Sequence, residues 1–264
     1  MTKQIISILG CGWFGFALAK KLISTGYHVK GSTTSPEKIS RLEEAGIEFF
    51  LINLSAEANS ADEAFFDSDV IFICIPPKRN SAELASYPDK IKSVLENVRD
   101  ERTKVVLISS TSVYGDENKI VNEITQTNPD TDSGRVIVAA EEILKSKYPN
   151  DYTVIRFAGL IGPERNPGRF FAGKTNVPNG LAPVNLLHQS DAVDIAITVL
   201  EKQAFGRIYN ACSPTHPTRN DFYTKAANDS GLELPEFLAE KTSWKIVESV
   251  NVPEFLEYQF KVMV

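Results

Sequence analysis

The feature that most constrains the fold is an alternation of short apolar runs with amphipathic stretches through the N-terminal half. The runs have the length of strands, and the stretches carry apolar residues at helical spacing. The expected strands are Ile5–Leu9, His28–Thr33, Glu48–Leu51, Val70–Ile75, Lys104–Ser109 and Tyr152–Phe157. The expected helices are Phe14–Ser24, Pro36–Ala45, Ser81–Val98 and Val136–Lys147. This alternation predicts an α/β fold, a doubly wound parallel sheet with helices on both faces.

A glycine-rich segment directly follows the first expected strand. Gly10-Cys11-Gly12-Trp13-Phe14-Gly15 matches the pattern G-x-G-x-x-G, and its last glycine lies in the first turn of a helix. We expect Gly10 to make the turn, Gly12 to let a pyrophosphate approach the backbone, and Gly15 to let the helix pack closely on the sheet. The helix N-terminus adds free N–H groups and a positive dipole end. The segment therefore predicts a Rossmann-type domain that binds a nicotinamide dinucleotide. The other expected cofactor-binding residues are Trp13, Phe14, Ile75, Pro76 and Ser109.

The end of the second strand favours NADP over NAD. An acidic residue at this strand end holds the ribose 2′-hydroxyl of NAD, whereas hydroxyl or basic side chains accommodate the 2′-phosphate of NADP. Here the chain reads Thr33-Thr34-Ser35, and the first acid is Glu37. We expect these hydroxyls to donate to the phosphate, with Lys38 or Arg41 adding positive charge. Ser35 followed by Pro36 is also a common way to start a helix, and the two roles are compatible.

The pattern changes beyond Gly162. Residues 163–185 are rich in proline and glycine and are expected as loop. The expected elements that follow are a helix at Asp191–Lys202, a strand at Ile208-Tyr209, a helix at Asn220–Ser230 and a less regular tail from Leu234. Asp191 precedes an apolar series and is expected as the N-cap of its helix. We expect residues 1–162 to form the dinucleotide-binding domain, with its sheet completed by segments around 184–212. Residues 163–264 are expected to form mainly a small C-terminal substrate-binding lobe, intertwined with the first domain.

Charge and composition exclude several classes of function. The net charge of −6 argues against nucleic acid as a partner, because phosphate binding favours a basic face. No apolar run approaches the roughly 18 residues of a membrane span, and no signal-peptide pattern precedes the first strand, so a cytoplasmic protein that does not act at a membrane is expected. Cys11, Cys74 and Cys212 show no paired metal spacing, so we expect reduced thiols and no metal site. Cys11 is expected as a small apolar filler or, alternatively, as a reactive thiol.

A serine-rich segment after the strand at Lys104–Ser109 points to a family. The segment from Ser109 to Gly115 resembles the S-S-x-x-V-Y-G motif of the extended short-chain dehydrogenase/reductases, the branch of sugar-nucleotide epimerases and dehydratases. Ile155 to Pro163 is similar to that family's L-R-x-x-x-x-x-G-P segment, Leu187 to Ala192 to its V-H-x-x-D-x segment, and Ile208 to Asn210 to its V-Y-N strand. A closer resemblance is to the YeeZ-like group of atypical bacterial members, on Ser133 to Arg135 and on residues 166–174 and 209–217. The resemblance covers nearly the whole chain and implies an NAD(P)-binding epimerase-like oxidoreductase.

The chain departs from this family where the chemistry is expected. The family uses Tyr-x-x-x-Lys, in which Lys lowers the pKa of the catalytic Tyr and holds the ribose. Aligning Gly134 and Glu141 with the family pattern places Ser133 at the Tyr position and Ile137 at the Lys position. An aliphatic side chain donates no hydrogen bond, and a serine without an adjacent base is a poor substitute for a tuned phenol. Phe157 also stands where the family has proline.

Four residues are candidates to replace the missing pair. Ser110 is the foremost, because the resemblance places its hydroxyl on the reacting group, although such serines often only satisfy backbone N–H groups. His188 is expected to face the substrate cleft, and an imidazole suits acid–base chemistry near neutrality. Arg135 is expected either to stabilise an oxyanion or to lie in solvent at a helix start. Tyr114 carries a phenol, although the resemblance implies a packing role for it.

The loop after Gly162 carries three cations, Arg165, Arg169 and Lys174. Basic residues of this region bind a diphosphate in the related sugar-nucleotide enzymes, and arginine suits that bidentate geometry. Arg169 and Lys174 are therefore predicted to bind substrate, with Phe170-Phe171 as a cleft wall. The alternative is a solvated loop that balances an acidic protein.

Two hypotheses of function follow. The first is an NADP-dependent oxidoreductase or epimerase-like enzyme that works without Tyr-x-x-x-Lys on a polar small molecule, with a nucleotide-linked one as an alternative. The second is a catalytically inactive protein that senses NAD(P) and reports to a partner. The retained Ser110, His188 and basic loop favour the enzyme, and the missing Tyr and Lys favour the sensor. Related proteins often pair through the helices after the fourth and fifth strands, so the resemblance allows a homodimer.

Overall fold

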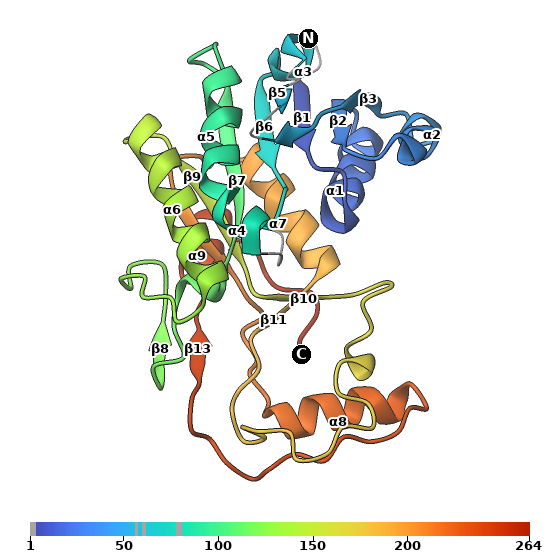
Figure 1. The fold of residues 1–264 in the computed structure, drawn as a ribbon, viewed down its shortest axis with the longest axis vertical. Coiled ribbons are helices and arrows are strands. Elements are labelled where there is room, and N and C mark those ends of the chain that lie inside the picture. Colours follow the sequence, from blue (N-terminus) through green and yellow to red (C-terminus); the bar gives the residue numbers. More distant parts are fainter. Residues whose placement is uncertain (1–3, 56–57, 60–61, 78–80) are drawn as a thin grey trace.

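A wholly parallel sheet forms the centre of the molecule. The computed structural model describes residues 4–55, 58–59, 62–77 and 81–264. Within them, seven strands pair in the order β12-β9-β7-β6-β1-β2-β3 (Figure 1). Their bounds are β1 Ile5–Leu9, β2 His28–Thr33, β3 Glu48–Leu51, β6 Val70–Ile73, β7 Lys104–Ser110, β9 Thr153–Phe157 and β12 Ile208–Ala211. The order of the strands reverses between β1 and β6, and in such sheets ligands bind beyond the carboxyl ends of the strands at this point. The predicted fold class is confirmed.

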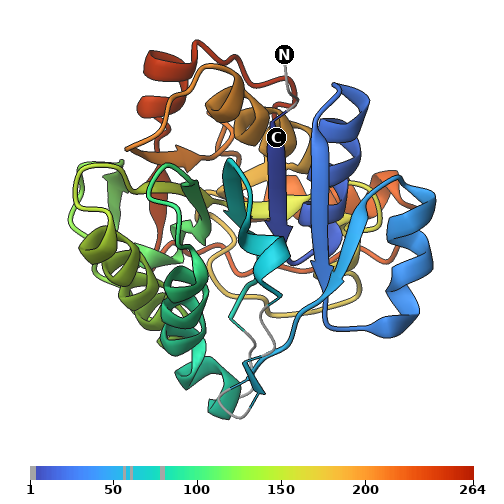
Figure 2. The same cartoon turned by 90° about the horizontal axis from the view of Figure 1, so that it is seen from above.

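Helices cover both faces of the sheet. Their bounds are α1 Trp13–Ser24, α2 Ile39–Glu44, α3 Glu63–Phe66, α4 Ser81–Ala85, α5 Tyr87–Asn97, α6 Asp132–Lys147, α7 Gln189–Glu201, α8 Arg219–Asp229 and α9 Asn251–Leu256. Helices α5 and α6 pack together on one face, and α1 and α7 pack together on the other (Figure 2). Because both faces are covered, the central strands are mainly apolar, and β6 is wholly apolar and buried.

A smaller lobe lies beyond the carboxyl ends of the strands, around helix α8 (Figure 1). The short strands β10 Gly159–Ile161 and β11 Leu186–His188 pair in parallel where the chain passes between the sheet and this lobe. Strands β8 Lys119–Val121 and β13 Lys245–Val247 form a second parallel pair, and β4 Leu54–Ser55 pairs antiparallel with β5 Ala58–Asn59. An aromatic cluster holds the lobe together. In it the ring of Phe171 packs edge-on against those of Tyr223 and Phe237, with centroids 4.7 and 5.5 Å away.

Several predicted elements begin or end elsewhere, for local reasons. The helix expected at Ser81–Val98 is divided into α4 and α5, because Pro88 lacks an N–H and is tolerated only in the first turn of a helix. The helix expected at Pro36–Ala45 begins with a 3-10 turn at Pro36–Lys38 before α2. Helix α6 begins at Asp132, earlier than expected, because the Thr131 hydroxyl caps it by accepting from the Gly134 N–H at 3.1 Å. The tail expected to be irregular contains β13 and α9.

The prediction that Asp191 caps its helix is wrong. Helix α7 begins at Gln189, and the ring Nδ1 of His188 caps it by accepting from the Ser190 N–H at 3.2 Å. The Asp191 carboxylate is fully buried and accepts instead from the Tyr258 hydroxyl at 2.6 Å and from the N–H groups of Lys261 and Val262 at 2.8 and 3.1 Å. Asp191 therefore holds the C-terminal segment against α7.

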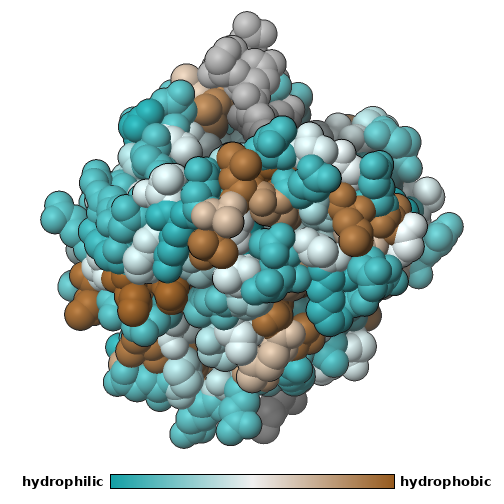
Figure 3. All heavy atoms as spheres, turned by 90° about the horizontal axis from the view of Figure 1, so that it is seen from below, coloured by the Kyte–Doolittle hydropathy of each residue, from teal (hydrophilic) through white to brown (hydrophobic). Residues whose placement is uncertain are grey.

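The face of the molecule drawn in Figure 3 is mainly hydrophilic. On the face seen in Figure 3, apolar residues form separate groups among hydrophilic ones. No helix in the described ranges is long and apolar enough to cross a bilayer.

Candidate functional site: a cleft along the glycine loop

The glycine loop takes the shape that its three glycines were expected to allow. Gly10 has φ of +97°, a left-handed value that favours glycine, and its N–H donates to the Ser32 hydroxyl at 2.9 Å. A Cβ on Gly15 would lie only 2.2 Å from the carbonyl oxygen of Gly10, so α1 approaches the sheet more closely than any other residue would permit. A Cβ on Gly12 would meet no atom within 4 Å. The surface above Gly12 is therefore open to a ligand.

The N-terminus of α1 faces this open surface. Gly12 is its N-cap, and no side chain caps the first turn. The first N–H groups of a helix have no partner within it, and they form the positive end of its dipole. This end is therefore suited to bind an anion such as a diphosphate.

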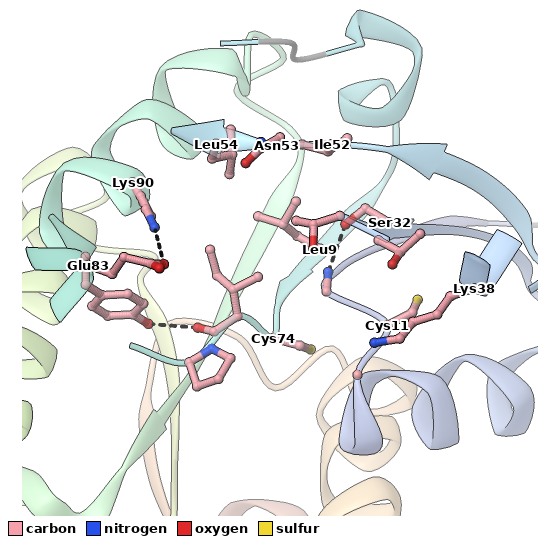
Figure 4. A pocket seen from close by; sticks show the side chains of 17 residues that line it. Leu9, Cys11, Ser32, Lys38, Ile52, Asn53, Leu54, Cys74, Glu83 and Lys90 are labelled. Atoms are coloured by element: carbon pink, nitrogen blue, oxygen red, sulfur yellow. Dashed lines mark hydrogen bonds and ion pairs between the residues drawn. The ribbon is translucent and has the colours of Figure 1, made fainter. Parts of the chain in front are cut away.

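The first of two adjoining cavities, here called the β2 cavity, lies between the glycine loop, the end of β2 and helices α4 and α5. Its volume is about 280 Å³. Figure 4 shows Cys11 and Lys38 on one side of it and Glu83 with Lys90 on the other, where the two charged groups lie 3.7 Å apart. It is lined by Leu9, Gly10, Cys11, Gly12, Ser32, Thr33, Thr34, Lys38, Ile52, Asn53, Leu54, Cys74, Ile75, Pro76, Glu83, Tyr87 and Lys90.

The end of β2 brings hydroxyls and a cation to this cavity. Thr33 is buried, and its hydroxyl accepts from the Ser35 N–H at 3.1 Å, while the Thr34 side chain is exposed. Ser35 precedes the turn at Pro36–Lys38 without a side-chain cap, and it is not among the residues that line the β2 cavity. Lys38 lines both this cavity and a neighbouring hollow on the outer side of the loop.

That neighbouring hollow is basic. Besides Lys38, its charged lining residues are Lys20 of α1, Arg41 of α2 and one acid, Glu164, so positive charge prevails. The Arg41 guanidinium lies 4.1 Å and the Lys20 ammonium 5.1 Å from the centre of the Phe16 ring. The ring holds two cations beside the loop, where they add positive potential to that of the helix end.

The second cavity, here called the β7 cavity, lies beyond the end of β7 and has a volume of about 540 Å³. Four serines line it: Ser109, Ser110, Ser112 and Ser133. An apolar wall comes from Phe14, Ile137, Phe157 and Leu160. The rings of Phe14 and Phe157 pack edge-on, with centroids 4.8 Å apart. The remaining lining residues are Gly12, Trp13, Gly15, Cys74, Ile75, Pro76, Pro77, Tyr87, Ile108, Ala158 and Arg165. Ser133 and Ile137, which stand at the positions of the family's Tyr and Lys, thus both line this cavity.

A buried polar cluster supports the serines from behind. The Ser109 hydroxyl donates to Oε1 of Glu141 at 2.5 Å, and Glu141 forms a bidentate ion pair with Arg156, at 3.0 and 2.6 Å. Nη1 of Arg156 donates to the Tyr114 hydroxyl at 2.6 Å. Tyr114 is almost fully buried, and burial is the main cause that raises its pKa. Tyr114 therefore belongs to this cluster and does not line the β7 cavity.

The other predicted residues take separate positions. Arg135 is exposed and pairs with Asp132 at 2.6 Å, outside the set of residues that line the β7 cavity. His188 caps α7, and a Cβ on Gly162 would lie 3.3 Å from its Nε2. Arg169 is exposed, and Lys174 lies over the Phe171 ring at 5.3 Å, so both belong to the lobe.

Two residues of the cleft were missed as site residues. Tyr87 of α5 lines both cavities and donates from its hydroxyl to the Ile75 carbonyl at 3.1 Å. Burial raises the pKa of Tyr87, with the charge of Glu141 as a smaller cause. Arg165 lines the β7 cavity, although the sequence placed it only within a basic loop. The signal for Arg165 was its position just after the Gly162-Pro163 turn, whereas nothing local marked Tyr87.

The thiol of Cys11 lines the β2 cavity but is buried. Burial raises its pKa to about 12, so the thiolate that reactivity requires is scarce at neutral pH. This favours the expected role as an apolar filler.

Comparisons with known proteins agree with this geometry. Protein YeeZ of Escherichia coli (strain K12) is 36% identical over 262 residues, which cover 97% of this chain and 95% of that protein. The chain belongs to the YeeZ family. A family model described as NADP oxidoreductase, coenzyme F420-dependent, also matches residues 5–112, the segment that contains the glycine loop.

Solved structures place the YeeZ family fold among known architectures. A short-chain dehydrogenase/reductase superfamily protein from Agrobacterium tumefaciens with bound NAD has a TM-score of 0.82 at 15% identity, covering 98% of this chain and 93% of that one. UDP-glucuronic acid 4-epimerase from Bacillus cereus in complex with NAD has a TM-score of 0.80 at 19% identity, covering 98% and 94%. At this level of identity the likeness shows the fold, which is that of the NAD-dependent epimerases and short-chain dehydrogenases. The expected resemblance is confirmed.

Proposed function

We propose that this protein is an NADP-dependent oxidoreductase of the epimerase-like type that acts on a polar small molecule. The observation that carries the proposal is that the two cavities adjoin along the glycine loop. Both are lined by Gly12, Cys74, Ile75, Pro76 and Tyr87. Such an elongated site suits a dinucleotide, with the adenosine part in the β2 cavity and the nicotinamide part in the β7 cavity. A bound nicotinamide would supply the hydride donor or acceptor.

The choice of NADP rests on charge at the end of β2. Thr33, Thr34 and Lys38 line the β2 cavity there, and Lys20 and Arg41 line the adjoining hollow. A 2′-phosphate in this place would receive hydroxyl donors and cations, and no carboxylate of β2 would hold a free 2′-hydroxyl instead.

Among the serines of the β7 cavity, Ser110 is the one we propose to hold the reacting group. Its hydroxyl oxygen accepts from the Ser112 N–H at 3.1 Å, so its own proton remains available to a ligand. The Ser109 proton is already donated to Glu141. A hydroxyl has one proton to donate, so Ser110 can bind a carbonyl oxygen of the substrate and Ser109 can only accept.

A fluorescence titration of the purified protein with NADPH and with NADH tests the cofactor. We expect clearly tighter binding of NADPH. In Lys38→Gln, NADPH should bind about tenfold more weakly or worse, while NADH binding should not change. Lys21→Gln is the matched control, because Lys21 is exposed near the other end of α1. Equal affinities for the two cofactors would contradict the NADP assignment, and no binding of either would remove the proposed function.

A second function, an NAD(P) sensor without catalysis, is favoured by one observation: the β7 cavity presents Ser133 and Ile137 where the family has its Tyr and Lys. Hydride transfer separates the two proposals. NADPH oxidation is followed by absorbance with a panel of carbonyl compounds, for the wild type and for Ser110→Ala and Ser109→Ala. In an enzyme, Ser110→Ala should abolish turnover at unchanged NADPH affinity, and Ser109→Ala should retain it. Cofactor binding without turnover across the panel would favour the sensor.

A further inference from the structure

Among the described residues that line the β7 cavity, Arg165 carries the one charged side chain. Its guanidinium lies over the indole ring of Trp13, 4.3 Å from the ring centre. The side chain is exposed, and it forms no ion pair with a carboxylate in the described ranges. Among the other cations of the loop and of the cleft, Lys174 contacts the Phe171 ring and Lys90 lies beside Glu83. The positive charge of Arg165 is therefore available to a ligand in this cavity.

A tight turn presents Arg165 to the cavity. The Arg165 N–H donates to the Gly162 carbonyl at 3.0 Å, and Gly162 donates back to the Arg165 carbonyl at 3.4 Å. Between them, Pro163 has a fixed φ and Glu164 has φ of +65°, the combination of a type II turn. This position normally holds glycine or asparagine, so the surrounding contacts must hold Glu164 there.

Trp13 attaches this turn to the glycine loop. Its indole Nε1 donates to the Pro163 carbonyl at 2.8 Å, and its own carbonyl accepts from Nε2 of Gln189 at 3.0 Å. The indole is thus held by the turn and the backbone of Trp13 by Gln189, and the ring provides a flat surface on which the guanidinium stacks. Stacking leaves the N–H groups at the edge of the guanidinium free, in the planar arrangement that matches a carboxylate or phosphate.

We propose that Arg165 is the anion-binding residue of the β7 cavity and that it binds the carboxylate or phosphate of the substrate. The assignment of this anion to a substrate rests on the proposed function. Apart from Arg165, the lining residues in the described part of the chain are apolar or carry hydroxyl or thiol groups, and none of them carries a carboxylate that would repel an anion. The substrate therefore carries an oxyanion at one end, an apolar part that lies against Phe157 and Leu160, and a polar group that reaches Ser110.

The cofactor diphosphate is the competing anion. It has its own binding place at the uncapped N-terminus of α1, whose N–H groups are free. Arg165 lines the β7 cavity together with Ser110 and is absent from the lining of the β2 cavity. These positions favour the substrate as the source of the oxyanion.

The stacked pair supplies its own probe. The chain has two tryptophans, so Trp244→Phe leaves Trp13 as the only one. In this background, Trp13 fluorescence is titrated with inorganic phosphate, with benzoylformate and with its uncharged methyl ester, each with and without saturating NADPH. We expect the two anions to change the emission, because the guanidinium shifts on the indole, and we expect no response to the ester. Arg165→Gln should weaken anion binding about tenfold or more, and Arg165→Lys should restore it only in part.

Arg102→Gln is the matched control, since it removes the same charge from an exposed side chain outside both cavities. Its anion affinity should equal that of the parent protein, and thermal unfolding should show all variants to be folded. No anion response in the parent, or the same affinity in Arg165→Gln and Arg102→Gln, would overturn the proposal. A tenfold loss of NADPH affinity in Arg165→Gln would assign Arg165 to the cofactor diphosphate and overturn the substrate assignment. If the parent protein binds no NADPH, the proposed function fails, while an anion response that depends on Arg165 still supports its role as an anion-binding residue.

Discussion

Alanine substitutions at Gly12 and Gly15 should separate ligand binding from folding, although the two glycines belong to one motif. Gly12 faces open space, and Gly15 packs against backbone. We expect Gly12→Ala to fold almost normally and to lose affinity for NADPH. Gly15→Ala should instead lose stability.

The magnitudes follow from the contacts of the added methyl group. At Gly15, the Cβ would lie 2.2 Å from the Gly10 carbonyl oxygen and 3.2 Å from Cγ2 of Ile8, where ordinary contact begins at 3.4 Å. Gly10 cannot move freely, because its N–H is bound to Ser32. Overpacking of this kind costs about 3 kcal/mol, which corresponds to a fall in Tm of about 6–12 °C in a chain of this size. At Gly12, φ is −77° and no atom is near, so only the weaker N-cap preference of alanine remains, at about 1 kcal/mol or less.

Thermal unfolding and NADPH titration of the two variants test this reasoning. In Gly12→Ala, the methyl group lies where a diphosphate would approach the α1 N-terminus, so affinity should fall about tenfold or more. The interpretation of the loop would be refuted if Gly12→Ala bound NADPH as the wild type does. A Gly15→Ala protein with unchanged Tm would show that the close approach of α1 is not required.

Three further predictions concern stability. Glu141→Gln should lower the free energy of unfolding, measured by chemical denaturation, by about 3–5 kcal/mol, because it leaves the buried Arg156 charge unpaired. Glu142→Gln on the exposed face of α6 should change it by about 0.5 kcal/mol or less. Equal effects of the two substitutions would contradict the buried pair. Asp191→Asn should lower the free energy of unfolding by about 2–3 kcal/mol, since an amide nitrogen replaces an accepting oxygen, and it should speed hydrogen exchange of the amides at 261 and 262. Unchanged exchange would show that contacts other than those of Asp191 hold the C-terminal segment. Burial raises the pKa of the Cys11 and Cys212 thiols to about 12, so the folded state keeps protons that the unfolded state releases. The free energy of unfolding should therefore fall by about 1.4 kcal/mol per thiol per pH unit above about pH 9. Replacing both cysteines with alanine should flatten this slope.

The sheet and the glycine loop could be predicted because their signals are local. Most strands contain a short apolar run, and the loop places its glycines at fixed distances from the first strand. The positions of Ser133 and Ile137 in the cleft could also be predicted, because aligning Gly134 and Glu141 with the family motif fixes both residues by their spacing. Helix ends were less accurate, since a cap or a proline changes them by several residues, as Thr131 and Pro88 do here.

Residues whose roles depend on distant partners could not be predicted. The partners of Asp191 lie about seventy residues along the chain, so its carboxylate resembled an ordinary N-cap. Tyr114 offered a phenol near the expected chemistry, and only the fold shows that Arg156, 42 residues further on, holds it in a buried cluster. Arg165 was one of three similar cations, and its contact with Trp13 across the fold distinguishes it from Arg169 and Lys174.

The titratable groups of the β7 cavity make a last prediction, about pH. Among the described lining residues, these are the Cys74 thiol and the Tyr87 hydroxyl besides Arg165. Burial raises the pKa of both, so both remain protonated across the neutral range, and an arginine keeps its charge throughout. An enzyme with Tyr-x-x-x-Lys gains activity as its tyrosine ionises, whereas here no group of the described lining changes its protonation between about pH 6 and about pH 9. Any hydride transfer should therefore be nearly independent of pH in this interval, with Ser110 as hydrogen-bond donor and solvent as the source of the proton. A kcat/KM profile with an inflection in this interval would contradict this prediction and would show that a further group takes part in the reaction.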